Sequence, residues 1–241
     1  MSAVNGAPDF GRFDVLTFDC YGTLIDWETG ILTALREVLD AHGVQADGEE
    51  LLASYARHEA AAEAGPYLPY RRVLARCLHG VCAELGVEPT AAEVGRFSES
   101  VADWPAFDDS KAALARLAEE FKLGVITNCD TDLFARSNER LGITFDWVIT
   151  AEQLGSYKPN PRNFELARAR IGGPPERHLH VAQSLYHDHV PAHALGLSTA
   201  WINRRHGRPG SGATPPTIFS PDFEFESMAD FAAALTAPGI G

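Results

Sequence analysis

The sequence of 241 residues predicts an α/β protein, a Rossmann-like parallel sheet core with an inserted all-helical cap subdomain. From about residue 105 onward, short apolar runs alternate with segments of helical spacing, a pattern typical of a parallel sheet with crossover helices. Between residues 27 and 104, helical spacing recurs and no strand pattern appears. We therefore expect a catalytic core formed by residues 1–26 and 105–241, and a helical cap formed by residues 27–104, inserted after the first strand.

The cap is predicted to begin just after the apolar run that ends at Asp19. Asp26 precedes the first cap helix, and an aspartate in that place commonly accepts a hydrogen bond from the first helical turn. Glycines or a Gly-Pro pair follow the first three predicted helices and mark their ends. The first of the four helices is expected to end near Gly43, and the other three are expected to span residues 51–64, 67–85 and 89–101.

The core is predicted to alternate strands and helices in the order that parallel pairing requires. A Gly-, Pro-, Ser- and Thr-rich stretch at 207–217 reads as a loop. The expected strands cover 123–127, 147–150, 178–182, 199–203 and 223–225, and the expected helices cover 109–120, 131–141, 161–171, 187–195 and 228–235.

Charge and composition narrow the possible partners and the compartment. Acidic residues outnumber basic ones by 33 to 20, so the net charge of −13 argues against nucleic acid or an anionic membrane as a partner. The four cysteines lack the paired spacing of metal sites. No apolar run approaches the ~20 residues of a membrane-spanning helix, and no signal-peptide pattern opens the chain. We therefore expect a cytoplasmic protein with reduced cysteines.

Polar side chains follow several predicted strands at the edge where such sheets bind ligands. Asp19 follows the first strand, and Thr127 with Asn128 ends the next, offering a hydroxyl and an amide that suit a carboxylate or an oxyanion. Lys158 precedes a predicted helix, and Asp188 is expected in the first turn of another. The sequence thus predicts one site that contains two carboxylates and an ammonium group.

These motifs, in this order, resemble the haloacid dehalogenase superfamily over nearly the whole chain. The run DCYGTL from Asp19 and the run WINR from Trp201 resemble its type II 2-haloacid dehalogenase branch. Within that branch, SLYHDH at 184–189 and SYKPNP at 156–161 are most similar to hydrolases that open the ring of azetidine-2-carboxylate.

The resemblance implies a role for each matching residue. It implies that Asp19 is a covalent nucleophile that forms an aspartyl ester, that Lys158 keeps it ionised, and that Asp188 serves the hydrolytic water. Thr127 and Asn128 would hold the substrate carboxylate, and Tyr21 would face the substrate.

Three further side chains carry open alternatives. Arg57 lies where the family has an arginine that meets the leaving group or the carboxylate, although a solvated charge on a helix face is equally compatible with its position. His187 and its neighbour His189 flank Asp188 and are candidates to protonate a departing amine; the alternative is that both face solvent at the start of a helix.

Position 21 decides between two reactions. Phosphatases of the superfamily carry a second aspartate there and another in the fourth motif, where this chain has Tyr21 and Gln183. An amide is a poor replacement for a carboxylate ligand of Mg²⁺. We therefore expect no cofactor, no bound metal, and a small carboxylic acid as substrate. The alternatives are a Mg²⁺-dependent phosphatase and a binding protein without turnover, and a homodimer is possible.

Overall fold

The computed structural model describes residues 9–237, so the first eight and last four residues of the predicted core lie outside the described part. The predicted fold class is confirmed: six parallel strands form one sheet in the order β3-β2-β1-β4-β5-β6. The strands are β1 (Val15–Phe18), β2 (Lys122–Thr127), β3 (Trp147–Thr150), β4 (His178–Ala182), β5 (Ser198–Ile202) and β6 (Phe223–Phe225).

Strand β1 lies in the middle of the sheet and is covered on both faces. Leu16, Thr17 and Phe18 are all fully buried, as expected for a strand enclosed by helices on two sides. Its neighbours are β2 and β4, with Thr17 opposite Gly124 and His180. Asp19, directly after β1, therefore stands at the centre of the edge formed by the strand ends.

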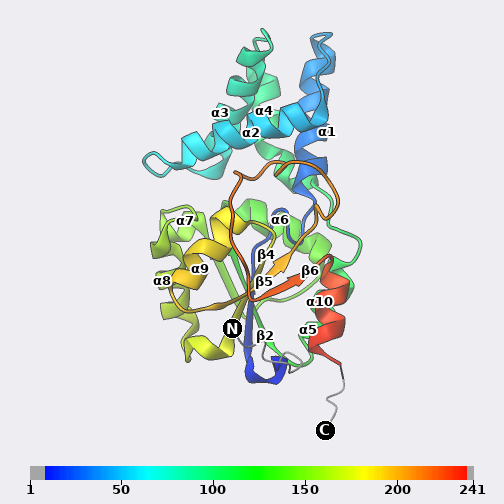
Figure 1. Ribbon diagram of the computed structural model, residues 1–241. Coiled ribbons are helices and arrows are strands. Elements are labelled where there is room, and N and C mark those ends of the chain that lie inside the picture. The colour runs from blue at the N-terminus through cyan, green and yellow to red at the C-terminus, as the bar shows by residue number, and fades with distance from the viewer. Residues whose placement is uncertain (1–8, 238–241) are drawn as a thin grey trace.

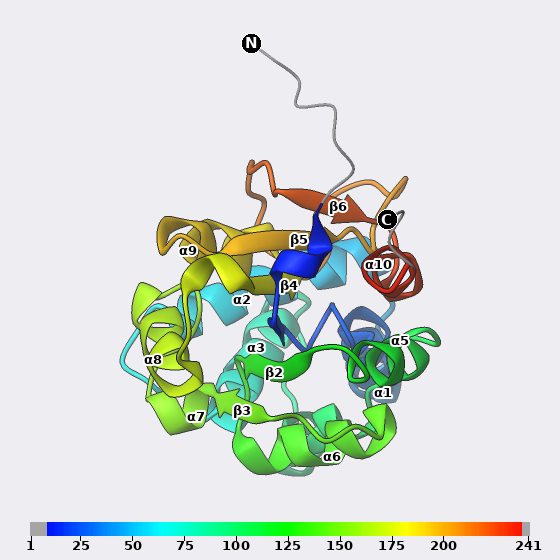
Figure 2. The same ribbon diagram turned by 90° about the horizontal axis from the view of Figure 1, so that it is seen from below.

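Helices cover the two faces of the sheet unequally. Viewed along the strands, α8 and α9 lie on one face and α5, α6 and α10 on the other (Figure 2). The core helices are α5 (Ser110–Leu117), α6 (Thr131–Leu141), α7 (Ala151–Leu154), α8 (Pro161–Ile171), α9 (Val190–Ala194) and α10 (Met228–Leu235), with short η1 (Phe10–Arg12) and η3 (Pro175–Arg177) turns.

Four helices and a short turn form a separate layer beyond the carboxyl ends of the strands (Figure 1). Asp26 accepts a hydrogen bond from Thr29 N at 3.2 Å, so it starts the first cap helix as predicted. Because this layer follows β1 directly, it covers the strand end that carries Asp19. Its elements are α1 (Trp27–Ala41), α2 (Gly48–Glu63), α3 (Tyr70–Glu84), α4 (Ala91–Glu99) and η2 (Ser100–Asp103).

One predicted helix is wrong in its boundaries. The segment expected to be a helix over 187–195 consists of a π-helical turn, η4 (Leu185–His189), followed by the shorter α9. Ser184 caps this turn by accepting a hydrogen bond from His187 N at 2.9 Å. Asp188 therefore lies in a wide turn rather than in the first turn of an α-helix, and such π-turns occur frequently at functional sites.

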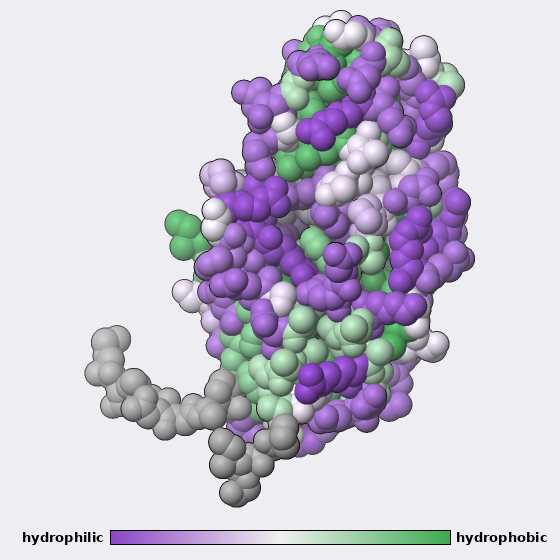
Figure 3. All heavy atoms as spheres, turned by 90° about the vertical axis from the view of Figure 1, so that its right-hand side faces the viewer, coloured by the Kyte–Doolittle hydropathy of each residue, from purple (hydrophilic) through white to green (hydrophobic). Residues whose placement is uncertain are grey.

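The face of the molecule shown in Figure 3 is mostly hydrophilic. On this face, hydrophobic side chains gather in a few areas among charged and polar ones, the broadest in the lower part of the view. Within residues 9–237, Val190 and Ile218 are the large hydrophobic residues that are exposed. No helix in the described chain has both the length and the apolar character to cross a membrane.

Candidate active site

Lys158 joins the two predicted catalytic carboxylates. Its Nζ atom donates to Asp19 Oδ1 at 2.8 Å, to Asp188 Oδ1 at 2.7 Å and to the carbonyl oxygen of Ile126 at 2.9 Å. An ammonium group has three hydrogens, so these bonds use all of them. Lys158 is only 1% exposed, and the structure thus encloses a triad of one ammonium group and two carboxyl groups.

A second chain of hydrogen bonds holds the other oxygen of Asp19. Thr23 Oγ1 donates to Asp19 Oδ2 at 2.9 Å, and the backbone N–H of Gln183 donates to the same hydroxyl at 2.9 Å. Because an ionised carboxylate only accepts, the hydroxyl hydrogen of Thr23 must point at Asp19. The orientation of the proposed nucleophile is fixed from both sides.

A buried histidine chain supports Asp188 from behind. His180 Nε2 lies 2.9 Å from Asp188 Oδ1, His180 Nδ1 lies 2.9 Å from Thr17 Oγ1, and that hydroxyl lies 2.7 Å from His178 Nε2. With Asp188 ionised, His180 donates from Nε2. In the tautomer with its hydrogen on Nε2, His180 accepts at Nδ1 from Thr17, whose hydroxyl accepts in turn from His178. This set, called here the His178–Thr17–His180 chain, orients Asp188.

The two aspartates have opposite pKa shifts. Burial raises the pKa of Asp19 above its ordinary value, and the charge of Lys158 counteracts this increase. Burial also acts to raise the pKa of Asp188, but Lys158 and His180 outweigh it and hold that pKa below its ordinary value. Burial acts to lower the pKa of Lys158, and the two aspartates more than reverse the effect. Lys158 is therefore charged, and Asp188 is an anion at neutral pH.

The triad borders a small inner cavity between the cap and the core. Its volume is about 30 Å³, close to the space of one water molecule. The lining residues are Asp19, Tyr21, Trp27, Glu59, Glu63, Tyr70, Asn128, Lys158, Ser184, His187 and Asp188. A substrate that reaches Asp19 must therefore displace side chains here, or the cap must move.

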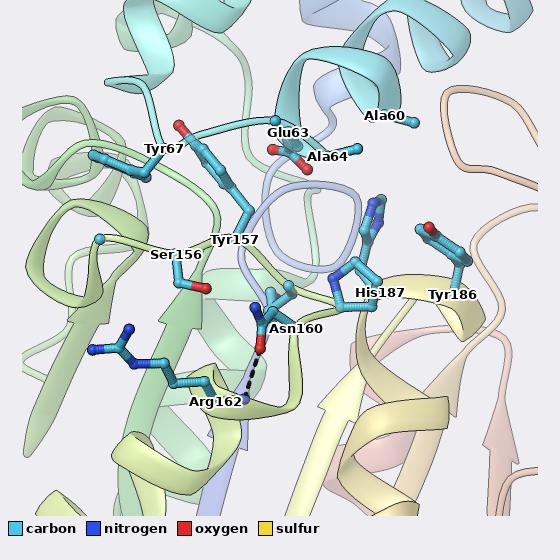
Figure 4. A pocket seen from close by; sticks show the side chains of 14 residues that line it. Ala60, Glu63, Ala64, Tyr67, Ser156, Tyr157, Asn160, Arg162, Tyr186 and His187 are labelled. Atoms are coloured by element: carbon cyan, nitrogen blue, oxygen red, sulfur yellow. Dashed lines mark hydrogen bonds between the residues drawn. The ribbon is translucent and has the colours of Figure 1, made fainter.

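A wider entrance cleft of about 370 Å³ adjoins the inner cavity and shares Glu63, Lys158 and His187 with it. Figure 4 shows Glu63 descending from cap helix α2 toward the side of the cleft formed by the core, from which His187 and Asn160 come. Arg162, which is exposed, lines the same cleft from α8. The cleft is thus a route from solvent, and its shared residues stand where the two spaces meet.

The structure brings most of the predicted binding residues to this place. Tyr21, Asn128 and His187 all line the inner cavity. Asn128 clamps the loop of Lys158, because its Oδ1 accepts from Lys158 N at 2.7 Å and its Nδ2 donates to Lys158 O at 2.9 Å. Thr127 ends β2 beside the site; its Oγ1 is buried and has no hydrogen-bond partner in the part of the chain that the structure describes, and the residue does not line the cavity. Its contact with substrate stays a prediction.

Arg57 is not brought to the site. Its side chain is 61% exposed and pairs with Glu84 of α3 at 3.0 Å. The reason is helical geometry: the α2 residues that line the inner cavity are Glu59 and Glu63, and a residue two positions before Glu59 lies on a different face. The expectation that Arg57 meets the substrate therefore has no support in this geometry.

The histidines beside Asp188 do not face solvent. His187 is 8% exposed, and its Nδ1 lies 3.0 Å from Ser184 Oγ, within hydrogen-bond distance. His189 is fully buried, and its Nε2 donates to the carbonyl oxygen of Ala182. Burial lowers the pKa of each to about 4. Neither imidazole is therefore charged at neutral pH, which argues against their role as a proton donor there.

Sequence reasoning missed the two glutamates of α2 and the histidine chain. Tyr55, Glu59 and Glu63 recur at intervals of four and so share one helix face, which was a detectable signal. His178 and His180 alternate along β4 and so point to one side of the sheet. Their partner Thr17 comes from the neighbouring strand, and only the strand order reveals that pairing.

The residues present do not fit a Mg²⁺ site of the phosphatase kind. The Tyr21 hydroxyl shares a hydrogen bond with Ser137 Oγ at 3.1 Å, and the amide oxygen of Gln183 accepts a hydrogen bond from Thr214 Oγ1 at 3.2 Å. Lys158 takes the Oδ1 atoms of both aspartates. Across residues 9–237, no group of three or more His, Cys, Asp or Glu side chains is arranged to hold a metal ion.

Comparisons with known proteins agree with this architecture. A model of the haloacid dehalogenase-like hydrolases matches residues 13–185. The chain is 28% identical to an (S)-2-haloacid dehalogenase of Pseudomonas fluorescens, over 79% of this chain and 84% of the relative. A defluorinating L-2-haloacid dehalogenase superposes with a TM-score of 0.78 at 26% identity, covering 93% and 96% of the two chains. The protein belongs to the haloacid dehalogenase-like hydrolases, as the motifs predicted.

A further structural neighbour shows the same fold with a reaction partner attached. It is the L-2-haloacid dehalogenase of Xanthobacter autotrophicus with chloropropionic acid covalently bound. The TM-score is 0.74 at 21% identity, with 94% of this chain and all of that chain covered. The chain is thus a hydrolase close in fold and sequence to L-2-haloacid dehalogenases.

Proposed function

We propose that this protein hydrolyses a small carboxylic acid at its C2 carbon, without a metal, through an aspartyl ester on Asp19. The observation that carries the proposal is the bridge from Lys158 Nζ to both Asp19 and Asp188. It supplies a buried carboxylate nucleophile with a fixed counterion and places a second carboxylate beside it. The relatives named as 2-haloacid dehalogenases support the same class of substrate.

The first step is a displacement at C2. An oxygen of Asp19 forms a bond to C2 while the bond from C2 to the leaving group breaks, and the leaving group departs with the electron pair. The bonds from Lys158 and Thr23 orient the carboxylate for this attack. The leaving group is a halide or an amine of a strained ring, as the resemblance to both kinds of hydrolase indicates.

The second step releases the product by attack of water on the carbonyl carbon of the ester. Asp188 Oδ1 is held by Lys158 and His180, whereas its Oδ2 atom is buried and has no partner within the described residues. That free oxygen is suited to accept a hydrogen from the water. Cleavage of the ester returns the Asp19 carboxylate with one oxygen from water. The product keeps the oxygen that Asp19 supplied and takes one proton of the water, and the other proton passes to solvent, which leaves Asp188 ionised again.

Isotopic labelling tests this sequence of bonds. In a single turnover with enzyme in excess and H₂¹⁸O as solvent, we expect ¹⁸O in the peptide that contains Asp19 and ¹⁶O in the product hydroxyl. Azetidine-2-carboxylate and 2-chloropropionate serve as substrates, with Asp19→Asn as the inactive control. Label in the product instead of the peptide means direct attack of water and overturns the ester.

The same preparation separates the other two candidate functions. Turnover is measured with these acids, fluoroacetate and a generic phosphate ester, with and without EDTA. Phosphate release that EDTA abolishes would support a Mg²⁺-dependent phosphatase, and the lack of turnover of any acid would support a binding protein. The expected result is turnover of an acid that EDTA leaves unchanged.

A further inference from the structure

Two carboxyl groups of cap helix α2 enter the inner cavity and have no place in the reaction proposed above. Glu59 is 4% exposed, and its Oε1 accepts hydrogen bonds from Tyr55 at 2.9 Å and Tyr70 at 2.8 Å. Glu63, one turn later, accepts from Asn128 Nδ2 at 3.3 Å and borders both the inner cavity and the entrance cleft. These two residues are called here the cap glutamates.

The charges around the cavity do not balance. Four carboxyl groups line it, namely Asp19, Asp188 and the cap glutamates, against a single cationic side chain, Lys158. All three hydrogens of Lys158 are used by the two aspartates and a carbonyl oxygen. A haloalkanoate would add a fifth carboxylate to this space without a cation to meet it.

A separate observation also indicates a missing donor. Asp188 is fully buried, lines the cavity, and has an Oδ2 atom without a hydrogen-bond partner among the described residues. A buried acceptor without a partner costs free energy, which a bound N–H or O–H group recovers. The cavity therefore combines an acceptor without a donor and more carboxyl groups than cations.

The pKa values of both cap glutamates are raised in this environment. Burial raises the pKa of Glu59 to about 7, although the two phenols act to lower it. Burial and the charge of Glu59 raise the pKa of Glu63 well above its ordinary value. Each carboxyl group therefore holds its proton to a higher pH than an exposed glutamate does, and a nearby cation would lower its pKa again.

We propose that Glu59 and Glu63 bind a positively charged nitrogen of the substrate, so that the substrate is a small amino acid or cyclic imino acid rather than a haloacid. This assignment rests on the proposed function and names its substrate class. Such a substrate brings its own cation to a site whose cation is already engaged. It also supplies N–H donors to the carboxylates that line the cavity.

Matched ligands test the assignment by binding alone. Azetidine-2-carboxylate and cyclobutanecarboxylate have the same ring size and the same carboxylate, but only the first carries an ammonium group. Calorimetric titration into Asp19→Asn, in two buffers of different ionisation enthalpy at pH 7, gives the affinity and the protons exchanged. We expect preferential binding of azetidine-2-carboxylate with net release of protons, because the cation displaces them from the cap glutamates.

Substitutions locate the effect on the two side chains. In the Asp19→Asn background, Glu59→Gln and Glu63→Gln should each weaken azetidine-2-carboxylate at least about tenfold, the scale of a charged hydrogen bond, and leave cyclobutanecarboxylate unchanged or tighter. Glu50→Gln, an exposed position on the same helix, is the matched control and should change neither ligand. Circular dichroism checks that each variant is folded.

Three results would overturn the assignment: equal affinity for the two rings, tighter binding of 2-chloropropionate than of azetidine-2-carboxylate, or binding of the amine without proton release. Because the titration involves no turnover, these outcomes are independent of the isotopic labelling of Asp19. If Asp19 is labelled but the titration shows none of the expected preference, the aspartyl ester is retained and the amine site is rejected. If Asp19 is not labelled but the titration gives the expected result, the ester is rejected and the amine site is retained. If a glutamine variant does not fold, proton release by the unsubstituted cap still decides the question.

Discussion

At the scale of single residues, Lys158 is the group on which the rest of the site depends. It is the shared partner of Asp19 and Asp188, and all three side chains are buried. Removing a buried cation leaves two carboxylates close together without compensation, so at least one must take a proton. The sequence motifs predicted the residue, but its three simultaneous hydrogen bonds follow from the geometry.

Substitution of this lysine should affect both stability and activity. We expect Lys158→Met to lower the free energy of unfolding by about 3–5 kcal/mol and kcat by about a hundredfold or more. Urea unfolding and steady-state kinetics measure the two effects. Lys122→Met is the control, because its partner Asp146 lies at the surface and such pairs contribute about 0–1 kcal/mol. Similar losses in both variants would contradict the special role of Lys158.

The His178–Thr17–His180 chain predicts an effect far from the substrate. Thr17→Val keeps the shape but removes the hydroxyl, leaving two buried imidazole nitrogens without a partner. We expect the free energy of unfolding to fall by about 1–3 kcal/mol, and kcat to fall by about tenfold to a hundredfold because Asp188 is less precisely held.

A readout beyond stability distinguishes positioning from general damage. In Thr17→Val, the acidic limb of the kcat profile should shift, because His180 orients and stabilises the Asp188 anion. Thr33→Val, which removes an exposed hydroxyl from α1, should change neither stability nor profile. An unchanged acidic limb in Thr17→Val would mean that the chain has only a structural role.

At the scale of elements, the site is a contact between a cap helix and the strand ends of the core. The start of α3 is fastened to the core by Asp130, whose carboxylate accepts from Tyr70 N at 2.7 Å and from Arg71 N at 3.2 Å. The first turn of a helix has free N–H groups, so a carboxylate from another element can cap it. The Tyr70 hydroxyl also donates a hydrogen bond to Glu59, so the capped end of α3 is connected to a residue of the inner cavity.

Loss of the Asp130 carboxylate should weaken the contact between the helical cap subdomain and the core. We expect Asp130→Ala to reduce the free energy of unfolding by about 1–2 kcal/mol, to speed hydrogen exchange in the first turn of α3, and to lower kcat/KM. Asp47→Ala is the matched control, since Asp47 caps α2 from within the cap itself. It should cost similar stability with kcat/KM retained. Equal loss of kcat/KM in the two variants would contradict a role for the contact between cap and core.

At the scale of the whole molecule, buried titratable groups set the response to acid. Burial lowers the pKa of His178 to about 3, and those of His187 and His189 to about 4. Unfolded histidines titrate near 6.5, so the unfolded chain binds more protons between pH 6.5 and 4, and stability falls as the pH falls. The cap glutamates act in the opposite sense, because they hold protons that the unfolded chain has lost above pH 4.5.

The double variant Glu59→Gln/Glu63→Gln separates these contributions. Without the glutamates, the free energy of unfolding should rise more steeply with pH between 4.5 and 6.5 than in the unsubstituted protein. Above pH 7 the variant should be the more stable of the two, because it no longer buries ionised glutamates. Chemical unfolding at a series of pH values measures both curves. Parallel curves would show that the glutamates titrate as they do in the unfolded chain.

Two predictions for the whole molecule remain for solution experiments. A homodimer is tested by light scattering on the eluting protein. The expected lack of binding to nucleic acid or anionic membranes, argued from the net charge of −13, is tested with DNA and with vesicles that contain anionic lipid.

Much of the architecture was predictable because it depends on local patterns. Each core strand is a short apolar run, and each predicted helix has a recognisable repeat, so the alternation after residue 105 gave the parallel sheet. The error at 187–195 arose because helical periodicity does not distinguish a π-turn followed by a short helix from one continuous helix. The site was predicted as far as its residues follow strand ends, as Asp19 and Asn128 do.

The fold class, the family, and the group of Asp19, Lys158 and Asp188 could be predicted from the amino-acid sequence, because they depend on order along the chain. Packing between distant segments is what exposes Arg57, brings Glu59 and Glu63 to the inner cavity, and joins two histidines through Thr17. The physical reason is that the phase of a helix and the neighbours of a strand are fixed by packing between distant segments. A pattern within one segment does not contain that information.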